Sequence, residues 1–212
     1  MLILALDVLD ERRAIEIAEE VRDFITMIKV NYPLVLSSGI EVIKKLSNIK
    51  PVIADFKIAD IPYTSSLIAR IAFENGAKAV ITHGFVGRDV IEAVKKVADE
   101  YNGGVYVVTE LSSEGGREFM EKFSLKIAEI ANEIGCDGLI VPATRTERIR
   151  EIRRRTSLKL IAPGVITQGG GIEETLKAGA DGIIVGRAIY NAENPKEVAK
   201  RIWEVMRRYK KI

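Results

Sequence analysis

Charged residues close the first apolar runs of the chain, and their types suggest proton-transfer chemistry. Asp7 and Lys29 end two of these runs, and the stretch ADFKIAD carries Asp55, Lys57 and Asp60. If the runs are neighbouring parallel strands, their carboxyl ends meet at one rim and the five charges converge there. Buried charges are tolerated only when they pair closely, and such clusters are more often catalytic than stabilising.

Within this cluster, Lys57 is the residue best suited to act as an acid. Its neighbours Asp55 and Asp60 are carboxylates, which favour the charged ammonium form of a lysine. A Schiff base or a general base would need the neutral amine, which these neighbours disfavour. The cluster therefore fits a reaction that develops negative charge on a carbon atom and ends with protonation of that atom.

A second pattern, nearer the end of the chain, predicts a phosphate site. The stretch APGVITQGGGIEE contains Gly169, Gly170 and Gly171, and the stretch VGRAIY contains Gly186 and Arg187. Glycines let backbone N–H groups approach an anion at the start of a short helix, and an arginine adds a charged fork. In (β/α)₈ barrels phosphate is often held after strands seven and eight, so the positions indicate a phosphorylated ligand.

Several common catalytic arrangements have no basis in this sequence. His83 is the only histidine, so Ser-His-Asp, Cys-His and multi-histidine metal sites are excluded. We expect His83 to be structural or to lie at the edge of the ligand. Cys136 and Trp203 are each the only residue of their type, and we expect both to be structural.

Eight short runs rich in β-branched residues are typical of buried parallel strands. They cover residues 2–6, 24–29, 51–57, 79–82, 104–109, 138–141, 158–162 and 182–185. Amphipathic stretches with helical spacing alternate with them, at residues 12–21, 40–46, 64–74, 90–100, 118–134, 145–154, 172–178 and 195–209. The sequence therefore predicts eight βα units.

We expect these units to close into a single (β/α)₈ TIM barrel domain that spans residues 1–212. Eight strict alternations without a composition break favour this α/β fold over an open doubly wound sheet. A flavodoxin-like or Rossmann sheet would need a glycine-rich phosphate turn after the first strand, where the sequence reads DVLDERR. Ile53, Asp55 and Lys57 share one strand face, which we expect to face the barrel mouth because the opposite face meets the helices.

The composition excludes several classes of partner. The sequence has 32 Lys and Arg residues and 30 Asp and Glu residues, so its net charge is close to zero. No overall positive electrostatic field therefore suggests binding to nucleic acid or to a membrane surface. The single cysteine cannot form an intramolecular disulfide, and the start MLILALD has no signal-peptide pattern. We expect a cytoplasmic protein with a substantial core, since 47% of its 212 residues are hydrophobic.

Six stretches together resemble the orotidine 5′-phosphate decarboxylase family, particularly its short archaeal form, and they span nearly the whole chain. They are LALDV, IKVNYPLVLSSG, ADFKIADIPYT, TELSS, APGVITQGG and VGRAIY. The Asp-x-Lys-x-x-Asp motif alone is also found in 3-keto-L-gulonate-6-phosphate decarboxylase and hexulose-6-phosphate synthase, which bind Mg²⁺. Those enzymes place a metal-ligating Glu near the end of strand two, where this sequence has Lys29, so the resemblance favours the nucleotide enzyme.

The resemblance implies a catalytic network of Lys29, Asp55, Lys57 and Asp60, with neither a metal nor an organic cofactor. It also implies a homodimer in which Asp60 reaches the partner's site. The substrate would be orotidine 5′-phosphate, which loses its C6 carboxylate, and protonation of C6 by Lys57 would give UMP.

The same resemblance implies the remaining substrate contacts. Asp7, Lys29 and Thr64 would contact the ribose, with Ile61 and Thr64 near the dimer seam, and Ser112 would meet the edge of the pyrimidine ring. Gln168 would bridge base and phosphate from a lid that also includes Gly169. The phosphate would be gripped by Gly186 and Arg187, and the pocket for CO₂ would be lined by Pro163 and Val165. The sequence departs from the family at two places. Asn31 stands where a glycine is common, and the lid reads ITQGGG where the familiar version is longer.

Two other classes of function remain as alternatives. A metal-using sugar-phosphate epimerase or aldol-type synthase is disfavoured by the lone histidine and by Lys29. A barrel that only binds a nucleotide or phosphate has no need for the buried charges of Asp55, Lys57 and Asp60.

Overall fold

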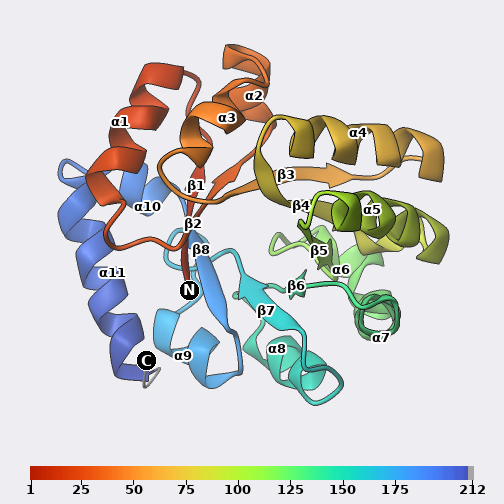
Figure 1. Ribbon diagram of the computed structural model, residues 1–212. Helices are drawn as coiled ribbons and strands as arrows, with labels where there is room; N and C mark the ends of the chain where they lie inside the picture. Colours follow the sequence, from red (N-terminus) through yellow and green to blue (C-terminus); the bar gives the residue numbers. More distant parts are fainter. Residues whose placement is uncertain (210–212) are drawn as a thin grey trace.

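The computed structural model describes residues 1–209 and shows a closed barrel of eight parallel strands (Figure 1). The strands are β1 (Leu2–Leu6), β2 (Met27–Val30), β3 (Val52–Ile58), β4 (Ala77–His83), β5 (Gly104–Val108), β6 (Gly138–Ile140), β7 (Lys159–Ala162) and β8 (Gly182–Val185). Each strand pairs with the next and β8 pairs with β1, so the predicted TIM barrel is confirmed. The prediction of one domain over 1–212 stays a prediction, and residues 210–212 lie outside the described residues.

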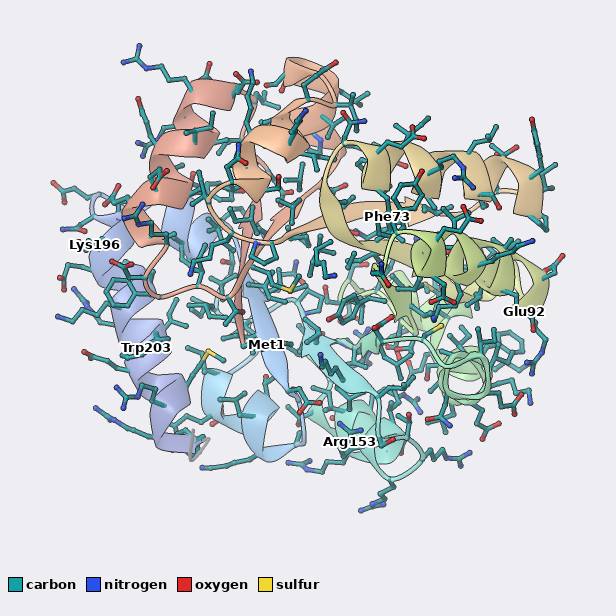
Figure 2. The ribbon with its side chains drawn as sticks, in the orientation of Figure 1. Met1, Phe73, Glu92, Arg153, Lys196 and Trp203 are labelled. Carbon is teal, nitrogen blue, oxygen red and sulfur yellow. The ribbon has the colours of Figure 1, made fainter. Side chains whose placement is uncertain are left out.

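Helices surround the strands in Figure 1. They are α1 (Glu11–Val21), α2 (Tyr32–Ser38), α3 (Val42–Ser47), α4 (Pro62–Glu74), η1 (Gly84–Val86), α5 (Arg88–Glu100), α6 (Gly116–Phe119), η2 (Glu121–Phe123), α7 (Ser124–Ile134), α8 (Thr146–Arg153), α9 (Ile172–Lys177), α10 (Arg187–Tyr190) and α11 (Pro195–Tyr209). Charged side chains such as Glu92 and Lys196 lie at the periphery on the outer helices (Figure 2). Among the described residues, no helix combines the length and apolar character that a membrane span needs.

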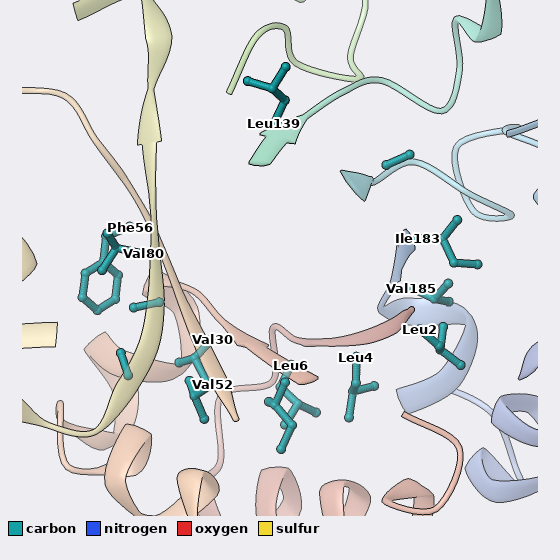
Figure 3. Close-up of a cluster of buried hydrophobic side chains, with 14 of the residues drawn as sticks. Leu2, Leu4, Leu6, Val30, Val52, Phe56, Val80, Leu139, Ile183 and Val185 are labelled. Carbon is teal, nitrogen blue, oxygen red and sulfur yellow. The ribbon is translucent and has the colours of Figure 1, made fainter. Parts of the chain in front are cut away.

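Alternation along the strands builds two apolar layers. Leu4, Leu6 and Phe56 point outward and pack in the layer between strands and helices (Figure 3). Ile3 and Ile53 point inward and fill the barrel itself. Since residues two apart on a parallel strand share a face, this alternation directs the polar residues that follow Ile53 towards the interior and the mouth.

The structure corrects several predicted element boundaries. The helix predicted over 118–134 is divided into α6, η2 and α7. The second strand begins three residues later than predicted, because residues 24–26 form the turn that connects α1 to β2. In this turn the Phe24 N–H donates to Val21 O, and the Thr26 N–H donates to Leu2 O.

Two short helices, α2 and α10, were not predicted from the sequence. Helix α2 follows β2 directly, and its start is fixed by Asn31, whose side chain accepts a hydrogen bond from the Tyr32 N–H at 2.7 Å. Pro33 in the first turn suits a helix start because that turn leaves backbone N–H groups without intrahelical partners. Asn31, which departs from the family pattern, therefore has a structural role as a helix cap.

Candidate active site

A cavity of about 350 Å³ lies at the carboxyl ends of the strands, and all eight strands or the segments after them contribute to its wall. Most of the predicted site residues meet there, namely Asp7, Lys29, Asp55, Lys57, Ser112, Pro163, Val165, Gln168, Gly186 and Arg187. The apolar floor is formed by inward-facing residues of the strands, among them Ile81, Ile140 and Ile184. This polar rim above an apolar floor is the usual arrangement of a barrel active site.

Asp55 lies between two lysine ammonium groups. Lys29 Nζ donates to Asp55 Oδ2 at 2.7 Å, and Lys57 Nζ lies 2.8 Å from both carboxylate oxygens. Asp7 Oδ1 lies 3.9 Å from Lys29 Nζ and adds a second negative charge on that side. Lys29 and Asp55 are buried, whereas the side chain of Lys57 is 32% exposed and faces the cavity.

The two buried charges of this cluster stabilise each other. Burial alone would raise the pKa of Asp55, but attraction to Lys29 and Lys57 and their hydrogen bonds outweigh it, so that pKa is lowered. Burial would likewise lower the pKa of Lys29, but the charges of Asp55 and Asp7 raise it overall. Lys29 and Asp55 therefore keep their charges in the barrel mouth, and Lys57 is the more exposed of the two lysines that a ligand could approach.

The backbone at Lys57 is strained. Its φ of 43° lies in the left-handed region, which is uncommon for residues other than glycine. The register between β3 and β4 also shifts between Ala54 and Ile58, so the end of β3 bulges where the lysine is presented. Strain of this kind persists only where the surrounding structure holds it, and it clusters at functional sites.

The loop after β7 closes on itself through its own backbone. The Ile166 N–H donates to Gly170 O at 2.8 Å, the Gly170 N–H to Gly164 O at 3.1 Å, and the Gly169 N–H to Ile166 O at 3.2 Å. In this loop conformation the N–H groups of Gly169 and Gly170 are therefore occupied within the loop, and the expectation that the glycine run offers its N–H groups to an anion stays a prediction. Gly169 also does not line the cavity.

The segment after β8 does lie at the cavity wall as predicted. Gly186 precedes α10, and a Cβ atom at this position would come within 3.3 Å of the Ala5 backbone and side chain. Glycine at position 186 therefore lets this segment pack closely against β1 at the cavity wall. Arg187 follows at the first position of α10 and also lines the cavity, where it can pair with a phosphate group.

Three predicted residues beyond the end of β3 do not reach this cavity. Asp60 is exposed, and its Oδ1 accepts a hydrogen bond from the Ile61 N–H at 2.7 Å. Ile61 is 65% exposed, and Thr64 lies on the first turn of α4. Of the five charged residues predicted to converge, four therefore line the cavity within one chain, and Asp60 does not.

The structure places at the site some residues for which no role follows from the sequence. Glu110 lines the cavity and is fully buried, and it pairs with Arg145, which is 2% exposed. Glu110 closely follows the valine-rich strand β5, and this position in the stretch TELSS is the sequence signal for a buried charge beside Ser112. Arg145 comes from a distant loop, so no local pattern could connect it with Glu110.

The remaining single residues behave largely as expected. Burial, with a smaller effect of Lys57, lowers the pKa of His83 to about 4, and its ring lies 4.6 Å from that of Phe85. Burial raises the pKa of Cys136 to about 12, so the thiol stays protonated. Trp203 packs edge-on against Phe24 at 6.0 Å between ring centroids.

Within residues 1–209 no group of three or more His, Cys, Asp and Glu side chains is placed to hold a metal ion.

Fold and site together define a (β/α)₈ barrel enzyme with a Lys-Asp-Lys cluster and an arginine suited to a phosphorylated ligand. The pattern of the orotidine 5′-phosphate decarboxylase / HUMPS family matches residues 1–202, so the chain belongs to this family. The orotidine 5′-phosphate decarboxylase of Methanococcoides burtonii is 51% identical over 97% of this chain and 96% of its own length. The enzyme of that name from Pyrococcus furiosus is 48% identical over 99% of both chains.

Solved structures agree with this assignment. Orotidine 5′-monophosphate decarboxylase from Methanocaldococcus jannaschii, complexed with inhibitor BMP, superposes with a TM-score of 0.93 at 47% identity, over 96% of both chains. The enzyme from Pyrococcus horikoshii superposes with a TM-score of 0.90 at 50% identity, covering 98% of this chain and 99% of its own. The resemblance to the archaeal form of the family, and the prediction of a carboxy-lyase of this family, are confirmed.

Proposed function

We propose that this chain converts orotidine 5′-phosphate to UMP and CO₂ without a metal or an organic cofactor. The bond between C6 of the pyrimidine and its carboxylate breaks, CO₂ leaves, and the electron pair stays on C6. The Lys57 ammonium then donates its proton to C6, and the neutral amine regains a proton from water. The observation that supports this most is the Lys29–Asp55–Lys57 cluster at the cavity, where the partly exposed side chain of Lys57 lines the ligand space.

The charges of this cluster explain how a carbanion without a conjugated electron sink can form. A preorganised ammonium lowers the energy of negative charge developing nearby, and fixed electrostatics of this kind is usually the largest single catalytic contribution. Asp55 fixes the position of Lys57 through 2.8 Å contacts to both its oxygens. Next to a substrate carboxylate it would also favour the loss of that group.

The other wall of the cavity suits the rest of the nucleotide. Gly186 and Arg187 would hold the phosphate, Ser112 would meet the ring edge, and Gln168 would reach from the loop after β7 towards both. Pro163 and Val165 would provide an apolar space for CO₂. Binding energy from the distant phosphate can then be used to close the loop over the reacting carbon.

We further propose that the enzyme is a homodimer with shared active sites. Helix α4 and the residues before it expose four large apolar side chains in the single chain: Ile61 at 65%, Tyr63 at 73%, Leu67 at 43% and Ile71 at 48%. An exposed apolar stripe of this size marks an interaction surface, and a two-fold axis would pair it with itself. Asp60 adjoins the stripe, so it would be carried towards the partner's Lys57, with Thr64 reaching the partner's ribose.

One assay tests the reaction directly. The protein is mixed with orotidine 5′-phosphate, and the absorbance of the pyrimidine is followed with and without EDTA. We expect a loss of absorbance that EDTA does not slow, with UMP and CO₂ as products. The absence of turnover under both conditions would refute the proposed reaction. Turnover that EDTA abolishes and Mg²⁺ restores would instead favour the metal-using alternative.

A further inference from the structure

Two consecutive residues of the loop after β6 hold the loop after β5 against the cavity. Thr144 Oγ1 donates a hydrogen bond to Ser112 O at 3.0 Å. The Arg145 guanidinium donates through Nη2 to Leu111 O, and its Nε pairs with the Glu110 carboxylate. Three consecutive residues that line the cavity, 110–112, are therefore each anchored from the same place.

Arg145 is used for this contact and not for its own helix. It occupies the position before α8, yet its side chain makes no capping hydrogen bond there. Its side chain is 2% exposed, and that of Glu110 is fully buried. Burial raises the pKa of Glu110, although the charges of Arg145 and Arg148 oppose this. Since replacing a buried ion pair with apolar residues is often neutral or stabilising, the pair is poorly explained as a contribution to stability.

The anchored loop in turn fixes the position of Ser112 relative to the loop after β7. A Cβ atom on Gly164 would lie 3.1 Å from Ser112 Cβ and 3.0 Å from Gln168 Oε1, so the three residues are in close contact. Gly164 itself has a φ of 92° and accepts the hydrogen bond from the Gly170 N–H. A shift of Ser112 would therefore alter both the polar group it offers to a ligand and the packing of the Gln168 loop.

We propose that Arg145, assisted by Thr144, is a positioning residue for the base-binding end of the active site. Its guanidinium holds residues 110–112 so that Ser112 presents its hydrogen-bonding groups to the pyrimidine ring. The inference rests on the proposed function, because it takes the ligand to be a pyrimidine nucleotide with its ring at Ser112. Arg145 itself does not contact the ligand, and the phosphate contacts at Arg187 do not depend on it.

The test compares two ligands that share the ribose phosphate and differ in the base. Binding of UMP and of ribose 5-phosphate is measured by calorimetry for the unaltered protein and for Arg145→Met and Thr144→Val. We expect Arg145→Met to weaken UMP binding about tenfold or more and to leave ribose 5-phosphate binding unchanged, since a misplaced polar group can cost this much. Thr144→Val, which removes only the hydroxyl, should lower the affinity for UMP relative to that for ribose 5-phosphate in the same direction, but by less.

Arg148→Met is the matched control. Arg148 Nε lies 3.5 Å from Glu110 Oε2 and so belongs to the same charge cluster, but its guanidinium pairs with the carboxylates of Glu110, Glu121 and Glu151. Its replacement should leave the ratio of the two affinities unchanged. Thermal unfolding of each variant shows whether the fold is retained, and Thr144→Val carries the test if Arg145→Met does not fold.

A double-mutant cycle distinguishes positioning from general stabilisation. If Arg145 acts through Ser112, Arg145→Met should reduce kcat/KM for orotidine 5′-phosphate strongly in the normal background and little in a Ser112→Ala background. Additive effects, or equal losses for UMP and ribose 5-phosphate, would overturn the inference. An unaltered protein that binds UMP no better than ribose 5-phosphate would instead contradict the proposed function.

Discussion

The two sides of the cavity are built in different ways. On the side of β1 to β3 the charged groups stand on strands or directly after them, and ion pairs of 2.7 to 2.8 Å fix Lys29, Asp55 and Lys57. On the side of β5 to β8 the polar groups stand on loops, such as Ser112 and Gln168, and those loops are held by backbone hydrogen bonds and by Arg145. The groups proposed to react thus lie on strands of the barrel, and the groups proposed to select and enclose a ligand lie on loops, which are in general the more mobile segments of a fold.

Each side also contains one strained residue. The φ of 43° at Lys57 belongs to the rigid side and the φ of 65° at Ile166 to the loop after β7. At Lys57 the neighbouring strands and ion pairs maintain the strain. Ile166 is 44% exposed and is held mainly by its own loop, so a change of loop conformation can relieve its strain. This difference predicts that substitutions on the strand side affect the chemical step, and those on the loop side affect binding.

The largest effect is expected from Lys57→Ala. Without the ammonium group neither the carbanion nor its protonation is supported, so turnover should be abolished. UMP should still bind, because the phosphate and base contacts lie on the other side of the cavity. Steady-state kinetics and calorimetry measure the two properties, and Lys159→Ala, at the exposed amino end of β7, is the control. Near-normal turnover in the Lys57 variant would remove this residue from the proposed role of proton donor.

A mixing experiment tests whether the strand side is completed by a second subunit. Lys57→Ala and Asp60→Ala proteins should each be nearly inactive. When they are unfolded together and refolded, a mixed dimer carries both lesions in one site and leaves the other intact. Random pairing should therefore restore about a quarter of all sites, because about half the dimers are mixed. If mixed dimers form and no activity returns, Asp60 does not serve the partner's site.

On the loop side, Arg187→Ala should act on binding. A charge-assisted hydrogen bond contributes roughly 1.5 to 3 kcal/mol, so affinity for UMP should fall about 10- to 150-fold. Affinity for uridine, which lacks the phosphate, should change little. Arg201→Ala, an exposed arginine of α11, provides the comparison. Equal losses for nucleotide and nucleoside would show that Arg187 supports the fold and does not grip the phosphate.

The same division explains what could be predicted from the sequence. The orientation of side chains on the strand side could be predicted because alternation along β3 decides which of them face inward. Ile53 and Phe56 lie on the predicted faces. The inward orientation of the charged side chains of Asp55 and Lys57 then follows from the two-residue period of a strand. The positive φ of Lys57 could not be predicted from the sequence, because it accompanies the register shift between β3 and β4.

The loop side was less predictable because its geometry depends on contacts distant in sequence. The glycine run indicated a phosphate-binding loop, yet the Gly169 and Gly170 N–H groups bond within the loop. Arg145 lies 34 residues from Leu111, which it contacts, and no local periodicity links the two. The proposed reach of Asp60 into a partner's site would likewise depend on contacts between chains, which no local sequence pattern specifies.

The smallest expected effect concerns His83, near the boundary between the two sides. Burial is the main reason that its pKa falls to about 4, and the nearby Lys57 lowers it further while Asp55 opposes this. In the unfolded chain a histidine has a pKa of about 6.5. Between these two values the unfolded state binds the extra proton and the folded state does not, so the free energy of unfolding should decrease as the pH falls from about 6.5 to about 4.

Urea unfolding of the unaltered protein and of His83→Gln, at steps from pH 7.5 to pH 4.5, measures this contribution. The unaltered protein should lose about 1 kcal/mol more than the variant over this range, a figure reduced because the ring is only half-buried. His83 is the only histidine, so no other imidazole contributes to the difference. The lowered pKa of Asp55 adds a separate loss that begins only near the ordinary aspartate value of about 3.9 and grows at lower pH. Parallel stability curves for the two proteins above pH 4.5 would show that His83 accepts a proton as readily in the folded barrel as in the unfolded chain.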